Sequence, residues 1–429
     1  MSTILAYTSP AMGHLFPMTP VLLELARRGH QVHVRTLASQ VGILRGLGLA
    51  AEPIDPRIEA ITHHDFTVKG PIKALAASVD VFVRRGALDG PDMAAALEDI
   101  EPDLAIVDFN AWGATCAATA HGGPWASVCP YTPPMGSRGV PPFGPGLLPM
   151  AGPLGRVRDA VVRRLTIGAI EKAFLPSINE VRSQHGLEAA PTTDAFFLGT
   201  PLLLVATAEP FEYPRPDWGD NVRLVGALSW EPPAEVPAWV EEPGDPFVLV
   251  TTSSEYQADE ALARAAVAGL AGEPYRVVVT MPAGVADLGP LPANVRVERF
   301  VPHSAVLAHA AAVVTHGGMG ATQKALNAGV PAVVVPWGRD QLEVAARVAH
   351  ARAGVRLGKA RLTPERLRDA VRRAAAMADG ARRVAAGYRA AGGAAAAADA
   401  VERLVPVPTL QADQPNSQAS TGHEAADRP

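Results

Sequence analysis

The chain has 429 residues, of which 48% are hydrophobic and 19% charged, so it can form two domains with full cores and is not composed like a disordered protein. Its formal charge of −5, without any cluster of lysine and arginine, argues against nucleic acid as a partner. No apolar run reaches the roughly 18 residues of a membrane-spanning helix, and no secretion signal is visible, so we expect no membrane insertion. The two cysteines, Cys116 and Cys129, argue against a disulfide framework and favour the reducing cytoplasm.

Apolar strands alternate with helical runs in the first half of the chain, which is typical of a doubly wound α/β domain. The strands expected there are residues 4–8, 31–34, 104–107 and 125–128. A helix is expected from about 17 to 28. The stretch 130–155 is rich in proline and glycine and has no periodicity, which predicts a long surface loop with a functional role.

The second half repeats the alternation after a stretch rich in proline and tryptophan. That stretch, 209–245, is predicted to link a first domain at 1–208 to a second at 246–383. The strands expected in the second domain are 246–250, 275–279, 295–297, 311–315 and 330–335. Alanine-rich helices are expected at 364–378 and 381–404, and the polar tail 408–429 is expected to be disordered. The sequence therefore predicts an α/β fold of two Rossmann-like, doubly wound domains.

The most informative motif runs from His316 to Thr322 and reads His-Gly-Gly-Met-Gly-Ala-Thr, between an apolar strand and a helical run. Glycines there let backbone N–H groups approach a phosphate closely, and the helix N-terminus adds positive potential. His316 and Thr322 can each donate a hydrogen bond to a diphosphate oxygen. The motif therefore predicts a diphosphate site.

A second polar motif, Asp340-Gln341, follows the next predicted strand. A carboxylate and an amide side by side suit sugar hydroxyls, which both donate and accept hydrogen bonds. A diphosphate site next to a sugar site predicts that the substrate is a nucleotide-sugar.

The turn after the first strand carries His14, within Ala-Met-Gly-His-Leu-Phe-Pro. A dinucleotide-binding fold would have Gly-x-Gly-x-x-Gly at this turn, which the chain lacks. A neutral imidazole in a cleft can accept a proton from a hydroxyl group. The alternative interpretation is that His14 only caps a helix.

Three more polar side chains follow predicted strands. Asp108 comes at the end of the strand at 104–107, and Ser253 and Ser254 follow the strand at 246–250. Residues of these types are also common as N-caps of the next helix, and that alternative remains open for each of them.

Residues 316–341 are similar to the HGGxGT…DQ donor-binding signature of family 1 glycosyltransferases, which have the GT-B fold and include antibiotic and natural-product enzymes. The segment 300–303, Phe-Val-Pro-His, occupies the place of the family's Trp-x-Pro-Gln, and the turn at 13–17 resembles its GHxxP. The resemblance implies that His14 is the catalytic base, that Asp108 stabilises its imidazolium, and that a last helix at 384–407 crosses back to the first domain. The donor-binding residues that it implies are Ser253, Ser254, Phe300, Val301, His316, Gly317, Gly318, Gly320, Thr322, Asp340 and Gln341.

The chain departs from the family pattern at two donor-site positions. Lys324 stands where most members have a glutamate that is expected to bind the ribose hydroxyls, and Phe300 replaces a base-stacking tryptophan. Losing that carboxylate matters less for a deoxyribose, so the two changes favour a dTDP-deoxysugar over a UDP-sugar as the donor. The alternative for Lys324 is an exposed helix residue without a role.

Together these features predict an inverting glycosyltransferase that moves a sugar to a small hydrophobic aglycone, with O-transfer in bacterial secondary metabolism as the default. The alternatives are C- or N-transfer, a GT-B isomerase or phosphorylase, and a non-catalytic accessory protein that binds nucleotide. No cofactor or metal is expected, because the chain has no Asp-x-Asp; His63, His64 and Asp65 lack a fourth ligand and are interpreted as acceptor-side surface. The loops 58–73 and 130–155 should shape the acceptor pocket, whereas the sequence predicts neither the acceptor nor the oligomeric state.

Overall fold

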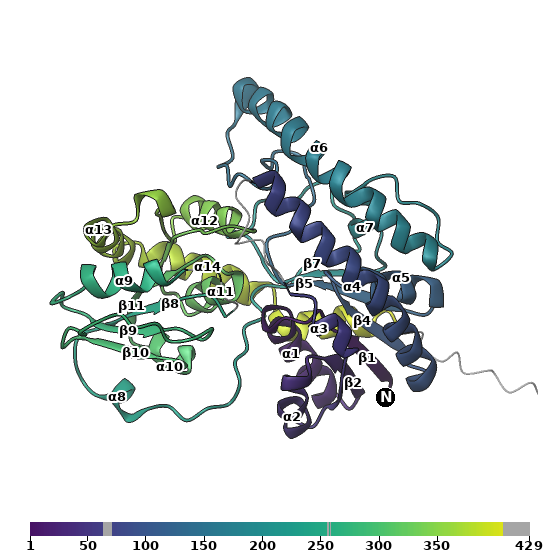
Figure 1. Ribbon diagram of the computed structural model, residues 1–429, viewed down its shortest axis with the longest axis horizontal. Coiled ribbons are helices and arrows are strands. Elements are labelled where there is room, and N and C mark those ends of the chain that lie inside the picture. Colours follow the sequence, from purple (N-terminus) through teal and green to yellow (C-terminus); the bar gives the residue numbers. More distant parts are fainter. Residues whose placement is uncertain (63–70, 255–256, 258, 406–429) are drawn as a thin grey trace, which may run out of the picture.

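The computed structural model describes residues 1–62, 71–254, 257 and 259–405. His63, His64, Asp65, part of the predicted loop at 58–73 and the predicted tail at 408–429 lie outside the described residues. The described chain forms two α/β lobes that are joined by a long connection and by the last helices (Figure 1).

The first lobe is built on a seven-stranded parallel sheet with the order β3-β2-β1-β4-β5-β6-β7. Its strands are β1 (Thr3–Tyr7), β2 (Gln31–Thr36), β3 (Ala50–Pro53), β4 (Leu104–Asp108), β5 (Trp125–Cys129), β6 (Leu203–Val205) and β7 (Val222–Leu224). The chain builds outward from β1 to β3 and then restarts on the other side of β1 with β4. Ligands bind beyond the carboxyl ends of the strands at such a switch point.

Helices cover both faces of this sheet, and the buried face of each is apolar. They are α1 (Met12–Arg27), α2 (Ala38–Gly46), α3 (Pro56–Glu59), α4 (Pro71–Ile100), α5 (Trp112–His121), α6 (Gly152–Gln184) and α7 (Thr193–Leu198). Helix α1 begins at Met12, five residues before the predicted start. Pro17 and Pro20 lie inside it, because Leu15, Met18 and Leu22 bury its inner face against the sheet and outweigh the missing N–H groups.

The second lobe has a six-stranded parallel sheet with the order β10-β9-β8-β11-β12-β13, which reverses between β8 and β11. Its strands are β8 (Phe247–Thr251), β9 (Arg276–Thr280), β10 (Val295–Glu298), β11 (Ala310–Thr315), β12 (Ala332–Val334) and β13 (Gly354–Arg356). The helices around it are α9 (Glu260–Gly269), α10 (His303–Leu307), α11 (Met319–Asn327), α12 (Gln341–His350) and α13 (Pro364–Ala375). The predicted fold class, two doubly wound α/β domains, is confirmed.

Two segments differ from the prediction. The stretch 209–245 is not only a connection, because its residues 222–224 form β7 and extend the first sheet; the remainder carries the short helix α8 (Ala238–Glu241). The long loop after β5 ends at residue 151, where α6 begins, a helix of 33 residues that has no clear apolar periodicity in the sequence. Its N-terminal half is largely exposed, so no buried stripe marks it in advance.

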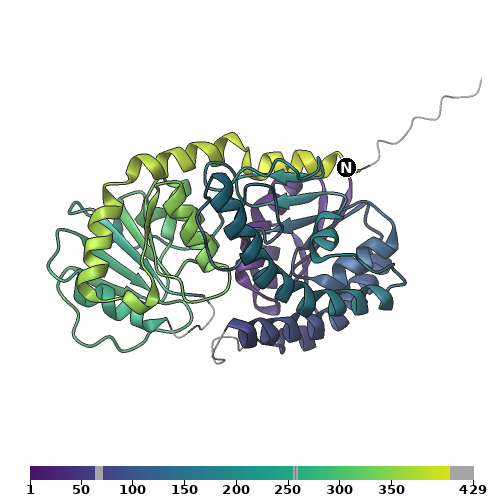
Figure 2. The same cartoon turned by 90° about the horizontal axis from the view of Figure 1, so that it is seen from above.

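The last two helices return the chain to the first lobe. Helix α14 (Ala378–Ala390) packs on the second lobe, and α15 (Gly393–Glu402) packs against α1. In Figure 2 the last helices run along one side of both lobes. Nη1 of Arg28 lies 2.6 Å from a carboxylate oxygen of Asp399 and 2.7 Å from one of Glu402. The single helix predicted at 381–404 is thus broken at Gly392, whose φ of 88° is readily adopted only by glycine.

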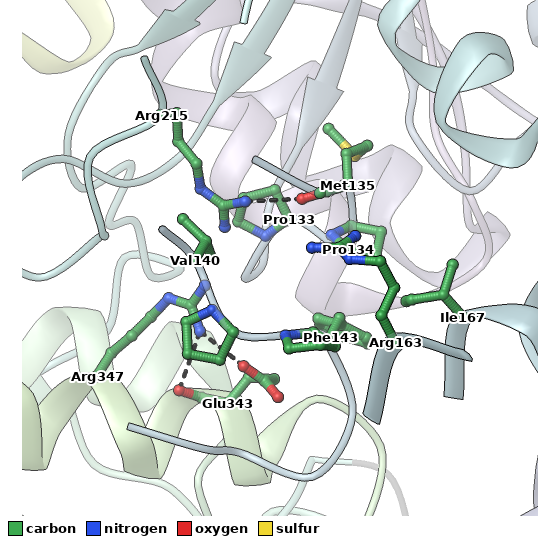
Figure 3. A pocket seen from close by; sticks show the side chains of 13 residues that line it. Pro133, Pro134, Met135, Val140, Phe143, Arg163, Ile167, Arg215, Glu343 and Arg347 are labelled. Atoms are coloured by element: carbon green, nitrogen blue, oxygen red, sulfur yellow. Dashed lines mark hydrogen bonds and ion pairs between the residues drawn. The ribbon is translucent and has the colours of Figure 1, made fainter. Parts of the chain in front are cut away.

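A buried ionic network joins the two lobes, and Figure 3 shows its Arg347–Glu343 pair. The guanidinium of Arg347, on α12, lies 2.8 Å and 3.0 Å from the two carboxylate oxygens of Glu212, in the connection, and 3.0 Å from Oε2 of Glu343. Oε1 of Glu343 accepts hydrogen bonds from the N–H groups of Gly144 and Gly146, in the loop of the first lobe, each at 2.8 Å. Burial alone raises the pKa of Glu212, but the charges of Arg347 and Arg215 outweigh it and hold the pKa below its ordinary value.

We predict that Arg347→Ala lowers the stability of the protein by about 3–5 kcal/mol, because it leaves the buried carboxylate of Glu343 without its cation and that of Glu212 with Arg215 alone. Thermal unfolding followed by circular dichroism measures the change. Arg372→Ala is the matched control. The side chain of Arg372 is exposed, so its ion pair with Glu273 should contribute little to stability. An equal loss of stability in both variants would contradict a special role of the buried Arg347 network in stability.

Candidate active site

A large cleft lies between the lobes, at the switch points of both sheets. It has a volume of about 610 Å³, within the range of small-molecule sites. Residues after β1 and β4 line it from the first lobe, and residues after β8 and β11 line it from the second. Sequence reasoning placed polar side chains at these four strand ends, and the structure brings them to one cavity.

His14 and Asp108 form a hydrogen-bonded pair on the first-lobe wall. Nδ1 of His14, in the first turn of α1, lies 2.8 Å from Oδ2 of Asp108, which is the last residue of β4 and fully buried. The carboxylate also accepts hydrogen bonds from Oγ of Ser9 and the N–H of Asn110, at 2.7 Å and 2.8 Å. Because Nδ1 donates its proton to this carboxylate, Nε2 is left as an acceptor at the edge of the cleft.

The capping alternatives for these residues are not what the structure contains. Helix α1 has Ala11 as its N-cap, α5 has Ala111, and α9 has Asp259, and none of the three uses a side-chain cap. Ser253 instead donates its N–H to Oδ2 of Asp259 at 2.7 Å, and both serines line the cleft.

The glycine-rich turn has the predicted strand–turn–helix form. His316 and Gly317 follow β11, and Gly318 is the N-cap of α11, so the first N–H groups of that helix are directed to the second-lobe wall. Gly317 has φ of 101°, and a Cβ there would lie 2.9 Å from Cγ1 of Val334. His316 is buried but lines the cleft, and its Nδ1 has no hydrogen-bond partner among the described residues.

Two residues of the predicted donor site point elsewhere. The hydroxyl of Thr322 is fully buried and donates to the carbonyl of Gly318 at 3.0 Å, so the prediction that this hydroxyl meets a diphosphate is wrong. A threonine one turn into a helix bonds back to the preceding turn when it is packed inward. The side chain of Val301 is buried among Val306, Leu307 and Val313 and does not line the cleft, so any contact with a ligand would be through its backbone.

Asp340 and Gln341 both line the cleft, but they differ in what is available to a ligand. Oε1 of Gln341 accepts from the N–H groups of Trp337 and Gly338, at 2.7 Å and 3.0 Å, and Nε2 donates to Gln257 at 2.8 Å. Its amide therefore shapes the turn. Asp340 lies 3.4 Å from the hydroxyl of Thr132, in the first lobe, and burial raises the pKa of its carboxyl group.

Phe300 and Lys324 line the far end of the cleft. The side chain of Phe300 is 47% exposed, so its ring is accessible from the cleft. Nζ of Lys324 lies 3.2 Å from Oε2 of Glu231, a residue of the connection that also accepts from the N–H groups of His303 and Ser304, each at 3.1 Å. Lys324 is therefore part of the site and not an unpaired surface residue.

Three residues of the wall were not found in the sequence. Asn110 and Tyr131 line the cleft beside His14, and Ser9 supports Asp108. Asn110 follows Asp108 by two positions, which is the only sequence signal; Tyr131 lies in the loop after β5, where no spacing rule applies. Cys116 and Cys129 are both buried and unpaired, as expected.

The described residues contain no group of three His, Cys, Asp or Glu side chains arranged to hold a metal ion. None of the described helices is long and apolar enough to cross a membrane. Independence from metals stays a prediction.

Comparison with known proteins identifies the class. The model of the family described as "Erythromycin biosynthesis protein CIII-like, C-terminal domain" matches residues 265–405. The 4'-demethylrebeccamycin synthase of Lentzea aerocolonigenes is 37% identical over 384 residues, which cover 86% of this chain and 90% of the relative. The demethyllactenocin mycarosyltransferase of Streptomyces fradiae is 27% identical over 436 residues, with 94% and 87% covered. The structure of the glycosyltransferase VinC in complex with dTDP has a TM-score of 0.68 at 25% identity and covers 94% of this chain and 99% of its own.

Two parallel-sheet lobes with a site between their switch points define a GT-B sugar transferase. The chain belongs to the family of GT-B glycosyltransferases of antibiotic and other natural-product pathways. The family resemblance, the fold and the enzyme class predicted from the sequence are confirmed. Relatives named as sugar transferases favour transfer over the isomerase and phosphorylase alternatives.

We predict that Gly317→Ala destabilises the protein by about 1–3 kcal/mol, because alanine is strained at this positive φ and its Cβ collides with Val334 and Gln341. Gly320→Ala is the matched control. It adds the same methyl group inside α11, where nothing lies within 4 Å, and should leave stability unchanged or raise it by roughly 0.4–1 kcal/mol. Denaturant unfolding of both variants measures the difference, and a stable Gly317→Ala protein would refute the strain at this turn.

Proposed function

We propose that the protein is an inverting glycosyltransferase that moves a sugar from a nucleotide-sugar to a small hydrophobic aglycone. The observation that carries the proposal is the His14–Asp108 pair, which lies across the same cleft from the N-terminus of α11. The His14–Asp108 pair can take a proton from the acceptor, and the N-terminus of α11 can bind the departing diphosphate. O-transfer is the default, and C- or N-transfer is the alternative on the same scaffold.

The reaction is a single displacement. Nε2 of His14 takes the proton of the acceptor nucleophile, and Asp108 stabilises the imidazolium that forms. The nucleophile forms a bond to the anomeric carbon as the bond to the diphosphate oxygen breaks, and the nucleoside diphosphate leaves with the electron pair. Attack from the opposite face inverts the anomeric centre.

Charge on the leaving diphosphate is met by neutral donors. Burial lowers the pKa of His316, so the ring is neutral near pH 7 and acts as a hydrogen-bond donor. The ring of His316 and the first N–H groups of α11 lie on the same wall of the cleft and are suited to diphosphate oxygens without a metal. Ser253 and Ser254 lie on the same wall, and Asp340 is the residue best placed to accept from sugar hydroxyls.

The first-lobe end of the cleft has an apolar wall of side chains from α1, α2, α4 and the loop after β5, namely Met12, Phe16, Ile43, Phe82, Pro130 and Phe143. The polar side chains of Gln40, Ser78 and Arg85, from the same helices, also line it. Such a wall supports a hydrophobic aglycone. A non-catalytic accessory role is disfavoured, because a protein that only binds nucleotide has no need of a buried carboxylate behind His14.

We favour a dTDP-sugar over a UDP-sugar as the donor. Lys324 takes the place of the ribose-binding carboxylate, and the nearby carboxylate of Glu231 already accepts from Lys324, His303 and Ser304. A ribose 2'-hydroxyl would therefore find no free carboxylate. The relative VinC is known in complex with dTDP, which agrees with this preference.

His14→Ala should lower kcat by about 10²–10⁴-fold and leave the affinity for nucleoside diphosphate nearly unchanged, because only proton transfer is lost. Turnover is measured by mass spectrometry with a library of aglycones, and affinity by calorimetry. His121→Ala, which removes an exposed histidine of the same lobe, is the control. Near-normal turnover of His14→Ala with an acceptor that is not already ionised would remove His14 from its role.

The donor preference is tested by calorimetry with dTDP, dUDP and UDP in the presence of EDTA. We expect dTDP and dUDP to bind with similar affinity and UDP no more tightly, because the 2'-hydroxyl brings no added contact. The dUDP arm separates the missing hydroxyl from the methyl group of thymine. A clear preference for UDP would refute the dTDP proposal, and binding lost only in EDTA would refute independence from metals; neither result would change the glycosyltransferase class.

A further inference from the structure

The side chain of Asn110 bridges two cleft residues that the proposed reaction places at its centre. Its Nδ2 lies 3.3 Å from Nε2 of His14, and its Oδ1 accepts a hydrogen bond from the hydroxyl of Tyr131 at 2.7 Å. The backbone N–H of Asn110 is held by Oδ1 of Asp108 at 2.8 Å. Both ends of the amide and its backbone are thus fixed around the imidazole.

The hydroxyl of Tyr131 determines which way the amide faces. Burial raises the pKa of this phenol well above its ordinary value, so the hydroxyl keeps its proton and acts as a donor. The oxygen of the amide must therefore face Tyr131, and the NH₂ group must face His14. The ring of Tyr131 also lies edge-on to the imidazole, with centroids 5.9 Å apart, which limits movement of the amide away from it.

This orientation acts on the protonation state of His14. Nδ1 donates to Asp108, and Nε2 accepts from Asn110, so both ring nitrogens are satisfied only in the neutral ring with the lone pair on Nε2. A proton on Nε2 would face the amide N–H groups. Among the described residues, the ionisable groups near His14 and Asn110 are Asp108 on β4, Cys129 at the end of β5, Tyr131 after β5, and Asp340 of the second lobe, which reaches the same loop through Thr132.

We propose that Asn110 is a positioning residue that keeps Nε2 of His14 unprotonated and directed into the cleft until an acceptor replaces the amide there. The proposal rests on the proposed role of His14 as the base. When the acceptor binds, its O–H or N–H group takes over the hydrogen bond to Nε2, and its proton then passes to that atom. After the products leave, Nε2 releases this proton to solvent, and the amide, still held by Tyr131, returns to the neutral ring.

The proposal is tested on the free enzyme by NMR titration of the His14 imidazole, assigned by comparison with His14→Ala. Asn110→Ala should raise the midpoint of the titration by about 0.5–1 pH unit, because a donor that favours the neutral ring is lost. Tyr131→Phe should raise it by less, because the amide stays but is free to turn. Gln40→Ala removes another amide from the cleft that has no hydrogen bond to His14 in the described structure, and its midpoint should match the parent.

Enzyme kinetics then distinguish the role of Asn110 from the role of His14. The acidic limb of the pH profile of kcat/KM, which reports the free enzyme, should move upward with the NMR midpoint, and kcat/KM at the parent's midpoint should fall about 2–5-fold in Asn110→Ala. If Asn110→Ala does not fold, Asn110→Ser and Tyr131→Phe give the same two readings. An unchanged midpoint in a folded variant would overturn the role of Asn110 while His14 remains the base. A raised midpoint with an active His14→Ala enzyme would instead overturn the proposed function and leave the contact intact.

Discussion

The cleft exists in this form because the lobes are held by Arg347, a buried cation shared by the two carboxylates of Glu212 and Glu343. Each carboxylate belongs to a different segment, one to the connection and one to α12. Through Glu343 the network also holds the glycine N–H groups of the loop after β5, and this loop carries Tyr131 at its start. A change of lobe orientation would have to break charged hydrogen bonds in a buried setting, which is costly. The network therefore sets the distance between the first-lobe wall and the second-lobe wall of the cleft.

The two walls of the cleft differ in the groups that they present. The first-lobe wall carries the imidazole of His14, whose Nδ1 bonds to a buried carboxylate, and the second-lobe wall carries the neutral imidazole of His316, the N-terminus of α11 and the guanidinium of Arg339. Fixed dipoles of this kind need no reorganisation as charge moves from nucleophile to diphosphate. In the proposed mechanism Asn110 has a matching role: a carboxylate beside an imidazole favours the charged ring, and an amide N–H at Nε2 opposes that tendency.

The sequence predicted the fold and the positions of the site far better than the contacts within it. Strand ends are visible as apolar runs, and parallel strands bring their carboxyl ends together, so His14, Asp108, Ser253 and His316 could be placed in one cavity from the sequence. The directions in which the side chains point could not be predicted from the sequence. Thr322 faces inward because its turn of α11 is buried, and Gln341 is held by partners on both ends, and both facts depend on packing. Short edge strands such as β7 and the exposed half of α6 also lack the periodicity on which prediction depends.

Lys324 shows how the meaning of a motif position depends on a distant segment. In the sequence, Lys324 replaces the carboxylate that the family has at this position. In the structure, its ammonium pairs with the carboxylate of Glu231, more than 90 residues earlier in the chain. That carboxylate is turned to the N–H groups that begin α10 and is closed to a ribose hydroxyl. The ammonium, with three protons and one carboxylate partner, keeps donors for the cleft. The proposed preference for a donor substrate with fewer hydroxyls therefore rests on the loss of a free carboxylate at the nucleoside end of the site.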